Sequence, residues 1–115
     1  MRTPIPSYAD NFRTAVHGTV FAKRTEVVHR LKRGDSLILV PDPPGTDLPN
    51  VWVHARGGDV VGHLPPEIGA WLCPWMLEGG RCHAEVEKVG TDEVASWRRL
   101  VIAVHCTLPE SETSE

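Results

Sequence analysis

The sequence predicts a mainly β domain of the α+β class: a small, six-stranded β-barrel with two short helices. Three observations support this prediction. Six segments of strand length alternate apolar and polar residues or form short apolar runs. The pair Gly57-Gly58 separates two of these segments, as in a β-hairpin. Short antiparallel strands in this number expose their edges unless the sheet closes on itself, so a barrel is the architecture we expect.

Each expected strand is bounded by residues that end strands, mostly glycine, proline or charged residues. In chain order, the six strands are expected at residues 16–23, 36–40, 51–55, 59–64, 81–89 and 97–108. The uninterrupted apolar run from Leu37 to Val40 predicts that both faces of the second strand are buried. The next segment, 41–50, holds four prolines and one glycine and cannot join a sheet. We expect a stiff surface loop there, which is a frequent location for a binding site.

Two short helices are expected between the strands. The first begins at Thr25, a residue type that caps helix N-termini, and ends before Gly34. The second begins at Pro65-Pro66, because a proline in the first helical turn loses no hydrogen bond, and it ends at Gly79. The helical residues expected to face the core are Val27, Val28, Leu31, Ile68, Trp71, Leu72, Trp75 and Met76.

The two ends of the chain differ in composition from its middle. Residues 1–10 are expected to form a flexible lead-in, residues 11–108 the folded domain, and residues 109–115 an acidic, disordered tail. The chain has a net charge of −3, but residues 11–108 contain 11 Lys and Arg against 11 Asp and Glu. Because contacts with phosphates dominate affinity for nucleic acids, this balance predicts weak and salt-sensitive binding of any nucleic acid.

The three cysteines, Cys73, Cys82 and Cys106, lack the spacing of a disulfide framework, and we expect them in the core of a cytoplasmic protein. Cys82-His83 and His105-Cys106 are two pairs of metal-ligand residue types. In a strand, however, neighbouring side chains point to opposite faces, so a cysteine and the adjacent histidine do not readily hold one ion. We therefore expect no metal and no other cofactor.

Enzymes and membrane proteins are disfavoured. No window approaches the run of about 20 apolar residues that a membrane helix needs, and no apolar core of a secretory leader follows the first residues. Asp42, Asp47 and Asp59 lack the dense spacing of a calcium loop. The sequence also lacks a nucleophile motif and a glycine-rich phosphate loop. We expect a binding function, not an enzyme.

The middle of the chain has a distinctive order of motifs. The loop Pro41-Asp42-Pro43-Pro44-Gly45-Thr46-Asp47-Leu48-Pro49-Asn50 precedes the strand Val51-Trp52-Val53-His54, a glycine turn, and Val60-Val61-Gly62-His63-Leu64-Pro65-Pro66-Glu67. This order resembles the HIRAN domain, in which an REPxNPxDxNA-like loop and strand precede a GxxxGYLP-like strand that runs into a helix. The resemblance spans residues 18–89. It implies a modified OB/SH3-like barrel that binds the ends of single-stranded DNA.

The resemblance also implies positions for a DNA site. Arg24 matches a family arginine at the end of the first strand, His63 matches a site residue of the DNA-end-binding members, and Asn50 matches the asparagine of the loop. Apart from the resemblance, Trp52 alternates with two valines and faces away from them, toward either solvent or a second core layer. If it faces solvent, its ring can stack on a base. The residues expected to contact DNA are Lys23, Arg24, Asp47, Asn50, Trp52 and His63.

Four positions depart from the family pattern. Thr25 and Glu26 replace two aromatic residues that follow the family arginine, and Leu48 stands where the family loop has an acidic residue, with Asp47 beside it. Pro66 replaces a basic residue that contacts phosphate. Each change removes a contact with DNA that the resemblance would otherwise imply.

Two functions remain open at this point. The first is weak recognition of single-stranded DNA, at its 3′ ends, in DNA repair or processing and together with a nuclease or helicase. The second is a protein-interaction adaptor that keeps the barrel but has lost the DNA site.

Overall fold

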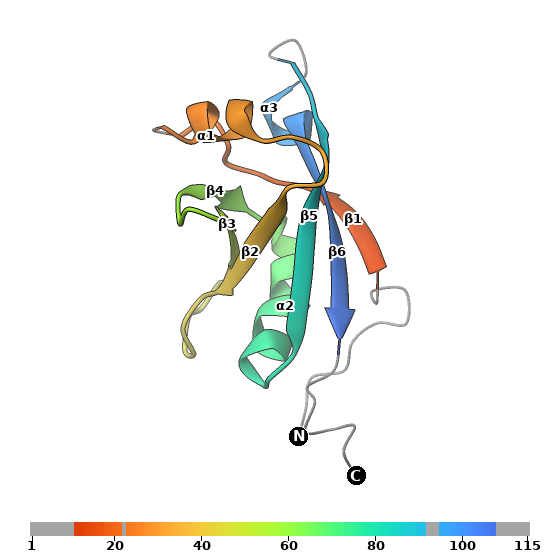
Figure 1. Ribbon diagram of the computed structural model, residues 1–115. Coiled ribbons are helices and arrows are strands. Elements are labelled where there is room, and N and C mark those ends of the chain that lie inside the picture. The colour runs from red at the N-terminus through yellow and green to blue at the C-terminus, as the bar shows by residue number, and fades with distance from the viewer. Residues whose placement is uncertain (1–10, 22, 92–94, 108–115) are drawn as a thin grey trace.

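The computed structural model describes residues 11–21, 23–91 and 95–107, so the expected lead-in and tail lie outside the described residues. The described strands form one antiparallel sheet in the order β1-β6-β5-β2-β3-β4 (Figure 1). They are β1 (Asn11–Ala15), β2 (Ser36–Pro41), β3 (Val51–Ala55), β4 (Val60–His63), β5 (Arg81–Val89) and β6 (Leu100–Thr107). The helices are α1 (Arg24–Arg30), α2 (Pro66–Leu77) and α3 (Ser96–Arg99). The prediction of a six-stranded, mainly β fold is confirmed.

The sheet curls into a half-barrel, and the chain after β1 bridges its two edges at one end. Val16 donates its backbone N–H to the carbonyl oxygen of Leu100 in β6, at 2.9 Å. The next residue, His17, exchanges two backbone hydrogen bonds with His63 of β4, at 2.8 and 2.9 Å. Residues 16 and 17, which directly follow the edge strand β1, therefore connect it to β4, the strand at the other edge of the sheet.

Helix α2 packs against the inner side of the curled sheet (Figure 1). Leu72 and Trp75 are at most 1% exposed and belong to the core cluster. Phe12 of β1 packs edge-on against Trp71 of the helix, with ring centroids 5.9 Å apart. A Cβ atom at Gly80 would lie 2.4 Å from the Trp75 ring, so the chain that leaves the helix passes directly over this indole. The helix thus fills the space that the strands leave open.

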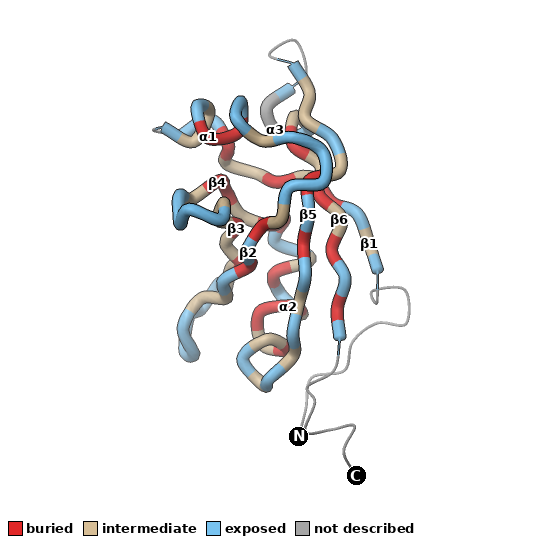
Figure 2. The backbone as a smooth tube through the Cα atoms, viewed as in Figure 1, coloured by how far each residue is buried: buried red, intermediate tan, exposed pale blue. Residues whose placement is uncertain are grey.

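Burial alternates along β5 and β6, as the sequence pattern predicts (Figure 2). Ala84, Val86, Ile102 and Val104 are at most 2% exposed and line the inner face of the sheet. This alternation is typical of a sheet that has one face against a core and the other in water. In the part of the chain that the structure describes, no helix has the length and apolarity to cross a membrane.

The expected first strand at residues 16–23 is wrong. The first strand is β1, which lies earlier in the chain, and the alternating pattern continues from it only as far as residue 17. Gly18 has a φ of +74°, and the backbone turns there. Val20 and Phe21 follow this turn and are exposed, so their spacing in the sequence does not reflect pairing in a sheet.

The expected burial of both faces of β2 is also wrong. Leu37 and Leu39 are buried, whereas Ile38 is 47% exposed and Val40 is 38% exposed. The helix that covers this part of the sheet packs on its inner side, because its buried residues belong to the same core cluster as Leu37 and Leu39. The continuous apolar run of β2 therefore forms a strand that has one buried apolar face and one exposed apolar face.

The helix boundaries differ from those expected. α1 begins at Arg24, and Thr25 is not its N-cap, because the Thr25 hydroxyl donates a hydrogen bond to the carbonyl oxygen of Thr19 at 3.3 Å. The helix ends at Arg30, before the expected stop. The start of the expected last strand forms the additional helix α3, so that β6 begins only at Leu100.

The cysteines and histidines of β5 and β6 lie on opposite faces of the sheet, as strand alternation predicts. Cys82 is opposite Cys106 on the inner face, and His83 is opposite His105 on the outer face. Among the described residues, no group of three or more His, Cys, Asp or Glu side chains is placed to hold a metal ion. Cys106 is buried as expected, whereas Cys82 is partly exposed.

Candidate nucleic-acid interface

A row of side chains crosses the outer face of the sheet where β2, β3 and β4 lie side by side. Trp52 of β3 is paired with Val40 of β2 on one side and with His63 of β4 on the other. His63 is bridged in turn to His17. Directly opposed residues point to the same face of a sheet. The valines on either side of Trp52 are fully buried, so the indole faces outward, as the sequence predicts.

Arg24, the first residue of α1, reaches this row. Its guanidinium carbon lies 5.7 Å from the ring centroid of Trp52 and 5.7 Å from that of Phe21. At these distances a cation is attracted to an aromatic face. The Trp52 ring packs edge-on against the His63 ring, with centroids 5.6 Å apart. We refer to Phe21, Arg24, Trp52 and His63 as the cation–aromatic cluster.

The loop around Gly18 brings Arg24 and His63 together. Arg24 Nη1 donates a hydrogen bond to the carbonyl oxygen of Gly18, at 2.9 Å. A Cβ atom at Gly18 would lie 3.2 Å from His63 Nε2 and 3.3 Å from Arg24 Nη1. The left-handed φ of this residue favours glycine independently of the space around it. The absence of a side chain at position 18 therefore leaves room for both the guanidinium and the imidazole beside this turn.

The ring of His63 has a defined orientation. Its Nδ1 lies 3.1 Å from the carbonyl oxygen of Leu64. A carbonyl oxygen only accepts hydrogen bonds, so Nδ1 carries the hydrogen in this contact. In the neutral ring, Nε2 then keeps its lone pair. This atom lies beside Gly18, 3.2 Å from the position that a Cβ atom would take there.

Asp42 holds the loop 41–50 against Trp52. Its Oδ1 accepts a hydrogen bond from Trp52 Nε1 at 2.8 Å, and its Oδ2 accepts one from the backbone N–H of Asn50 at 2.8 Å. The backbone N–H of Asp42 donates to the carbonyl oxygen of Asn50 at 2.9 Å. The thiol of Cys73 donates to the carbonyl oxygen of Asp42 at 3.6 Å. The two ends of the loop are thus tied together, and the carboxylate orients the indole.

The six predicted site residues lie in three different settings in the structure. Arg24, Trp52 and His63 lie in the cation–aromatic cluster. Asn50 adjoins the cluster through Asp42, which contacts both Asn50 and Trp52. Lys23 is exposed directly before the helix, and Asp47 is exposed within the loop.

Two residues of the site have no role in the sequence prediction. Phe21 lies three positions before Arg24, whereas the family pattern places aromatic residues after the arginine. Its contact depends on the turn at Gly18, which alternation does not reveal. The role of Asp42 follows from the register of β2 and β3: Pro41 is opposite Val51, so the next residue outward faces Asn50. A hairpin register drawn across the loop would have indicated this pairing.

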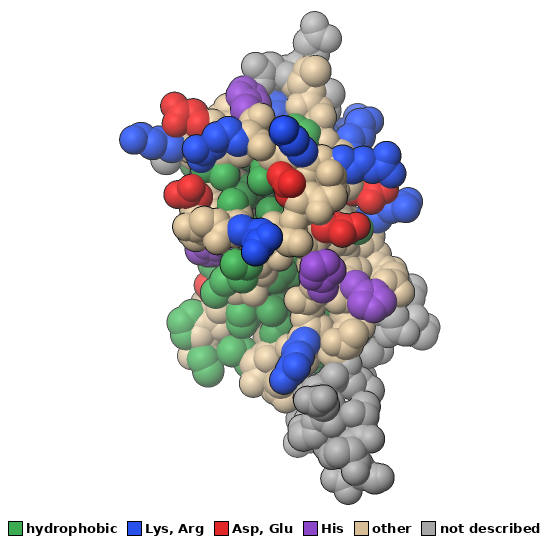
Figure 3. All heavy atoms as spheres, in the orientation of Figure 1, with side chains coloured by type: hydrophobic (Ala, Val, Ile, Leu, Met, Phe, Trp, Pro, Cys, Tyr) green, Lys and Arg blue, Asp and Glu red, His purple; other side chains and the backbone are tan. Residues whose placement is uncertain are grey.

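The surface near the cluster is partly apolar. Ile38 and Val40 on the outer face of β2 are exposed, and Leu48 in the loop is 85% exposed. Figure 3 shows hydrophobic side chains along the side of the molecule that carries β2 and the loop, with Lys and Arg side chains above them around α1.

The ion pair of Arg30 with Asp59, at 3.7 Å, joins two largely exposed side chains and contributes little to stability.

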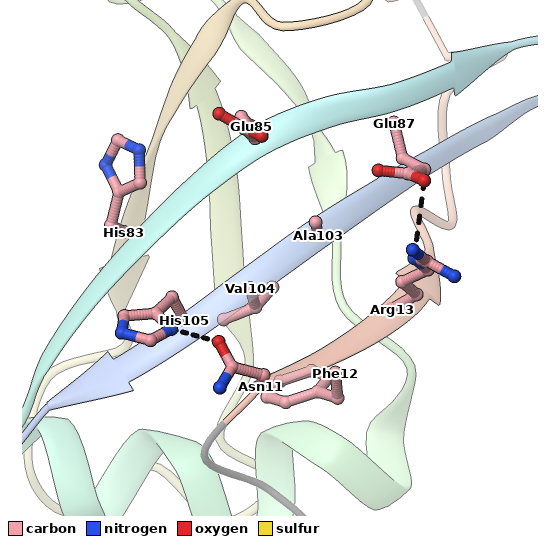
Figure 4. Close-up of a pocket in the computed structure, with 9 residues that line it drawn as sticks. All are labelled: Asn11, Phe12, Arg13, His83, Glu85, Glu87, Ala103, Val104 and His105. Carbon is pink, nitrogen blue, oxygen red and sulfur yellow. Dashed lines mark hydrogen bonds and ion pairs between the residues drawn. The ribbon is translucent and has the colours of Figure 1, made fainter.

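A separate cleft of about 730 Å³ lies on the outer face of β1, β5 and β6 (Figure 4). Several of its polar side chains are paired with one another. Arg13 Nε lies 3.3 Å from Glu87 Oε1, and His105 Nδ1 donates a hydrogen bond to Asn11 Oδ1. The residues that line this cleft do not include any of the predicted DNA-contacting residues. It is therefore distinct from the cation–aromatic cluster.

Removing the Asp42 carboxylate should loosen the loop. We expect Asp42→Ala to lower the free energy of unfolding by about 1–3 kcal/mol, because two hydrogen bonds to a charged group are lost in a half-buried position where water replaces part of them. Urea unfolding measures this change. Trp52→Phe removes one of the two bonds and keeps a ring. In the Asp42→Ala background Trp52→Phe should cost less than it costs alone, whereas strict additivity would show that the indole is positioned by other contacts.

Comparisons with known proteins support the fold. No family model matches the sequence, and no curated protein matches it significantly. The structure is similar to the crystal structure of the HIRAN domain of human HLTF, with a TM-score of 0.60 and 17% sequence identity. The match covers 90% of this chain and 80% of that chain. The order of strands, loop and helix in the sequence suggested a resemblance to HIRAN domains. The three-dimensional structure agrees with it, because the chain has the fold of a HIRAN domain.

Proposed function

We propose that this domain is a non-catalytic module that binds single-stranded DNA at its ends. The observation that supports this proposal is the cation–aromatic cluster, in which a guanidinium lies against two aromatic rings beside an imidazole. Aromatic side chains stack on bases without strong sequence preference, and arginine pairs with phosphate through charge-assisted hydrogen bonds. The order of motifs in the sequence supports the same function. It resembles that of HIRAN domains, and this resemblance implies recognition of DNA ends.

Each residue of the cluster has a distinct role in this proposal. Phe21 is 61% exposed and offers a ring to a base, and Trp52 offers a second ring at the same distance from the guanidinium carbon. Arg24 binds the terminal phosphodiester. His63 Nε2 accepts a hydrogen bond from the terminal 3′ hydroxyl, because its lone pair remains when Nδ1 carries the hydrogen. Lys23 adds a positive charge next to this phosphate site.

The binding should be weak and sensitive to salt. Residues 11–108 carry no net charge, so few phosphates are neutralised, and affinity falls as salt competes for them. Weak recognition of an end suits a domain that acts together with a nuclease or helicase in DNA repair or processing, which is the setting that we propose.

A protein-interaction adaptor is the second candidate function. The exposed apolar residues Ile38, Val40 and Leu48 favour it, because they lie on the outer face of β2 and in the adjoining loop, where a protein partner would find apolar surface. The near-neutral charge also suits a protein partner better than DNA. This candidate predicts no measurable affinity for single strands.

Fluorescence anisotropy with short labelled oligonucleotides separates the two functions. At low salt, a single strand with a free 3′ hydroxyl should bind, and the same strand with a blocked 3′ end should bind about five- to tenfold more weakly, which is the value of one neutral hydrogen bond. A blunt duplex should bind more weakly than either strand, because its bases are already stacked and paired. A strand blocked at its 5′ end is the matched control and should bind as the free strand does.

The outcomes distinguish general binding of single strands from recognition of their 3′ ends. Equal affinity for free and blocked 3′ ends would remove the role of His63 and leave a module that binds single strands without recognising their ends. If no single strand binds even at low salt, the DNA function is wrong and the adaptor function takes its place.

A further inference from the structure

Two thiols face each other across the ladder between β5 and β6. Cys82 is directly opposite Cys106, and their sulfur atoms are 3.6 Å apart, joined by a thiol–thiol hydrogen bond. On both sides the ladder is regular, with Arg81 opposite Thr107 and His83 opposite His105. Its irregularity lies several residues away, near Val86. The strands therefore hold the two cysteines in a fixed register.

This register suits a covalent bond between the sulfur atoms. The Cα atoms of directly opposed residues in antiparallel strands are about 4.5–5.5 Å apart, and disulfides form over Cα separations of about 4.4–6.8 Å. The sulfurs need to approach by about 1.5 Å to reach bonding distance, which rotation of the two side chains supplies without sliding the strands. Cys82 is partly exposed and Cys106 is buried, so an oxidant reaches Cys82 first.

The third cysteine lies apart from this pair. Cys73 is fully buried in α2, and its thiol donates a hydrogen bond to the carbonyl oxygen of Asp42. Its partner is therefore a backbone oxygen of the loop and not a thiol. Oxidation that begins at Cys82 has Cys106 as the neighbouring thiol.

We propose that Cys82 and Cys106 are an oxidative modification site, at which a low-molecular-weight disulfide such as oxidised glutathione converts the two thiols into an intrachain disulfide. The Cys82 thiolate attacks the glutathione disulfide, forms a mixed disulfide and releases one glutathione thiolate. The Cys106 thiolate then attacks the Cys82 sulfur and releases the second glutathione thiolate. Two cysteine thiols are oxidised, one glutathione disulfide is reduced to two thiols, and the two protons end on the glutathione molecules.

The same contacts make this reaction slow. The hydrogen bond that the Cys82 thiol shares with Cys106, together with burial, raises the pKa of this thiol well above its ordinary value. The thiolate is the attacking species, so a thiol whose pKa is raised reacts slowly at neutral pH. The site thus responds to sustained oxidising conditions and not to a brief pulse of oxidant.

The disulfide should stabilise the fold. Cys82 and Cys106 are 24 positions apart, and the cross-link constrains the segment between them, which holds α3, in the unfolded chain. A loop of this length loses enough unfolded-state entropy to raise the melting temperature by about 5–15 °C. β5 and β6 contribute no residue to the cation–aromatic cluster, so the affinity for single-stranded DNA should stay the same. This inference is therefore independent of the proposed DNA function.

The test uses the full chain, incubated for hours with oxidised glutathione or with dithiothreitol. After oxidation the intact mass should fall by that of two hydrogen atoms, and the number of alkylatable thiols in the denatured chain should fall from three to one. Peptide mapping should join the segments that contain Cys82 and Cys106. The melting temperature of the oxidised sample should exceed that of the reduced sample, and dithiothreitol should reverse the shift.

Two variants serve as controls. The comparison of the oxidised with the reduced native chain does not depend on them. Cys82→Ser removes the partly exposed thiol that reacts first, so this variant should keep its two remaining thiols after oxidation. Cys106→Ser removes the thiol that resolves the mixed disulfide, so this variant should retain one glutathione adduct on Cys82 and form no intrachain disulfide. In the native chain, a stable glutathione adduct on Cys82, a cross-link that involves Cys73, or a melting temperature of the oxidised protein no higher than that of the reduced protein would overturn the proposal.

Discussion

Replacing Gly62 with alanine should lower the free energy of unfolding by about 2–4 kcal/mol, through overpacking and the loss of two backbone hydrogen bonds. A Cβ atom at this position would lie 2.3 Å from the carbonyl oxygen of His17 and 2.7 Å from Val16 Cγ1. The first of these atoms belongs to the backbone and cannot rotate away. The bridge between residues 16–17 and β4 must therefore open, with its hydrogen bonds between His17 and His63.

The matched control for this change is Gly57→Ala. Gly57 lies in the turn between β3 and β4, its φ is not left-handed, and a Cβ atom there would meet nothing within 4 Å. This variant should stay within about 0.5 kcal/mol of the native protein or be slightly more stable. Urea unfolding of both variants measures the difference. Equal stability of the two variants would show that the bridge between the edges of the sheet is not a rigid part of the fold.

Gly62→Ala should also affect the candidate site. The residue precedes His63, whose ring packs on Trp52, so a shift of the β4 backbone moves the imidazole away from Arg24. If the protein binds single-stranded DNA as proposed, Gly62→Ala should weaken binding under conditions where the variant is still folded, and Gly57→Ala should not.

Replacing Arg24 with alanine should weaken binding of single-stranded DNA by about 1–3 kcal/mol, the range for one charge-assisted hydrogen bond. The salt dependence of binding should also become shallower, by about one neutralised phosphate. Arg24→Lys keeps the charge but loses the planar group that lies near both Phe21 and Trp52, so it should recover only part of the affinity. His63→Ala should cost less affinity and should reduce the preference for a free 3′ hydroxyl.

Arg33→Ala is the matched control for Arg24→Ala. Arg33 is exposed in the turn before β2, so its removal changes the net charge equally but leaves the cluster intact. It should weaken binding only slightly, through general electrostatics. Anisotropy titrations at two salt concentrations measure both variants, and far-ultraviolet circular dichroism checks that they are folded. If Arg24→Ala binds as tightly as Arg33→Ala, the cluster is not the site of DNA binding.

Sequence reasoning alone indicates three of the four residues of the cation–aromatic cluster. Arg24 and His63 follow from the motif order, and the outward orientation of Trp52 follows from its alternation with buried valines. Phe21 was not predicted, because its approach to Arg24 depends on the left-handed turn at Gly18 and not on its distance in the sequence. The two positions after the arginine hold Thr25 and Glu26, where the family pattern has aromatic residues. Phe21, which precedes the arginine in the chain, lies beside it instead.

Periodicity predicted which strands exist more accurately than where they end. The hairpin of β3 and β4 and the loop 41–50 lie where glycines and prolines indicated them. The strand expected at 16–23 fails because alternation describes spacing along the chain and contains no information about a change of partner. The burial expected for Ile38 and Val40 fails because hydrophobicity alone does not show whether a second layer covers the outer face.

The sequence by itself determined the location of five of the six described strands, the proline-rich loop, the hairpin and the faces of β3, β5 and β6, because each of these depends on residues that are close in the chain and on the two-residue repeat of a strand. Only the tertiary structure decided which side chains meet. Contacts that join residues from different elements include the bridge of His17 to His63, the bonds of Asp42 to Trp52 and Asn50, and the approach of Arg24 to the rings of Phe21 and Trp52. Such contacts depend on strand register, on the direction of turns and on the curl of the sheet, and local residue patterns do not encode these directly.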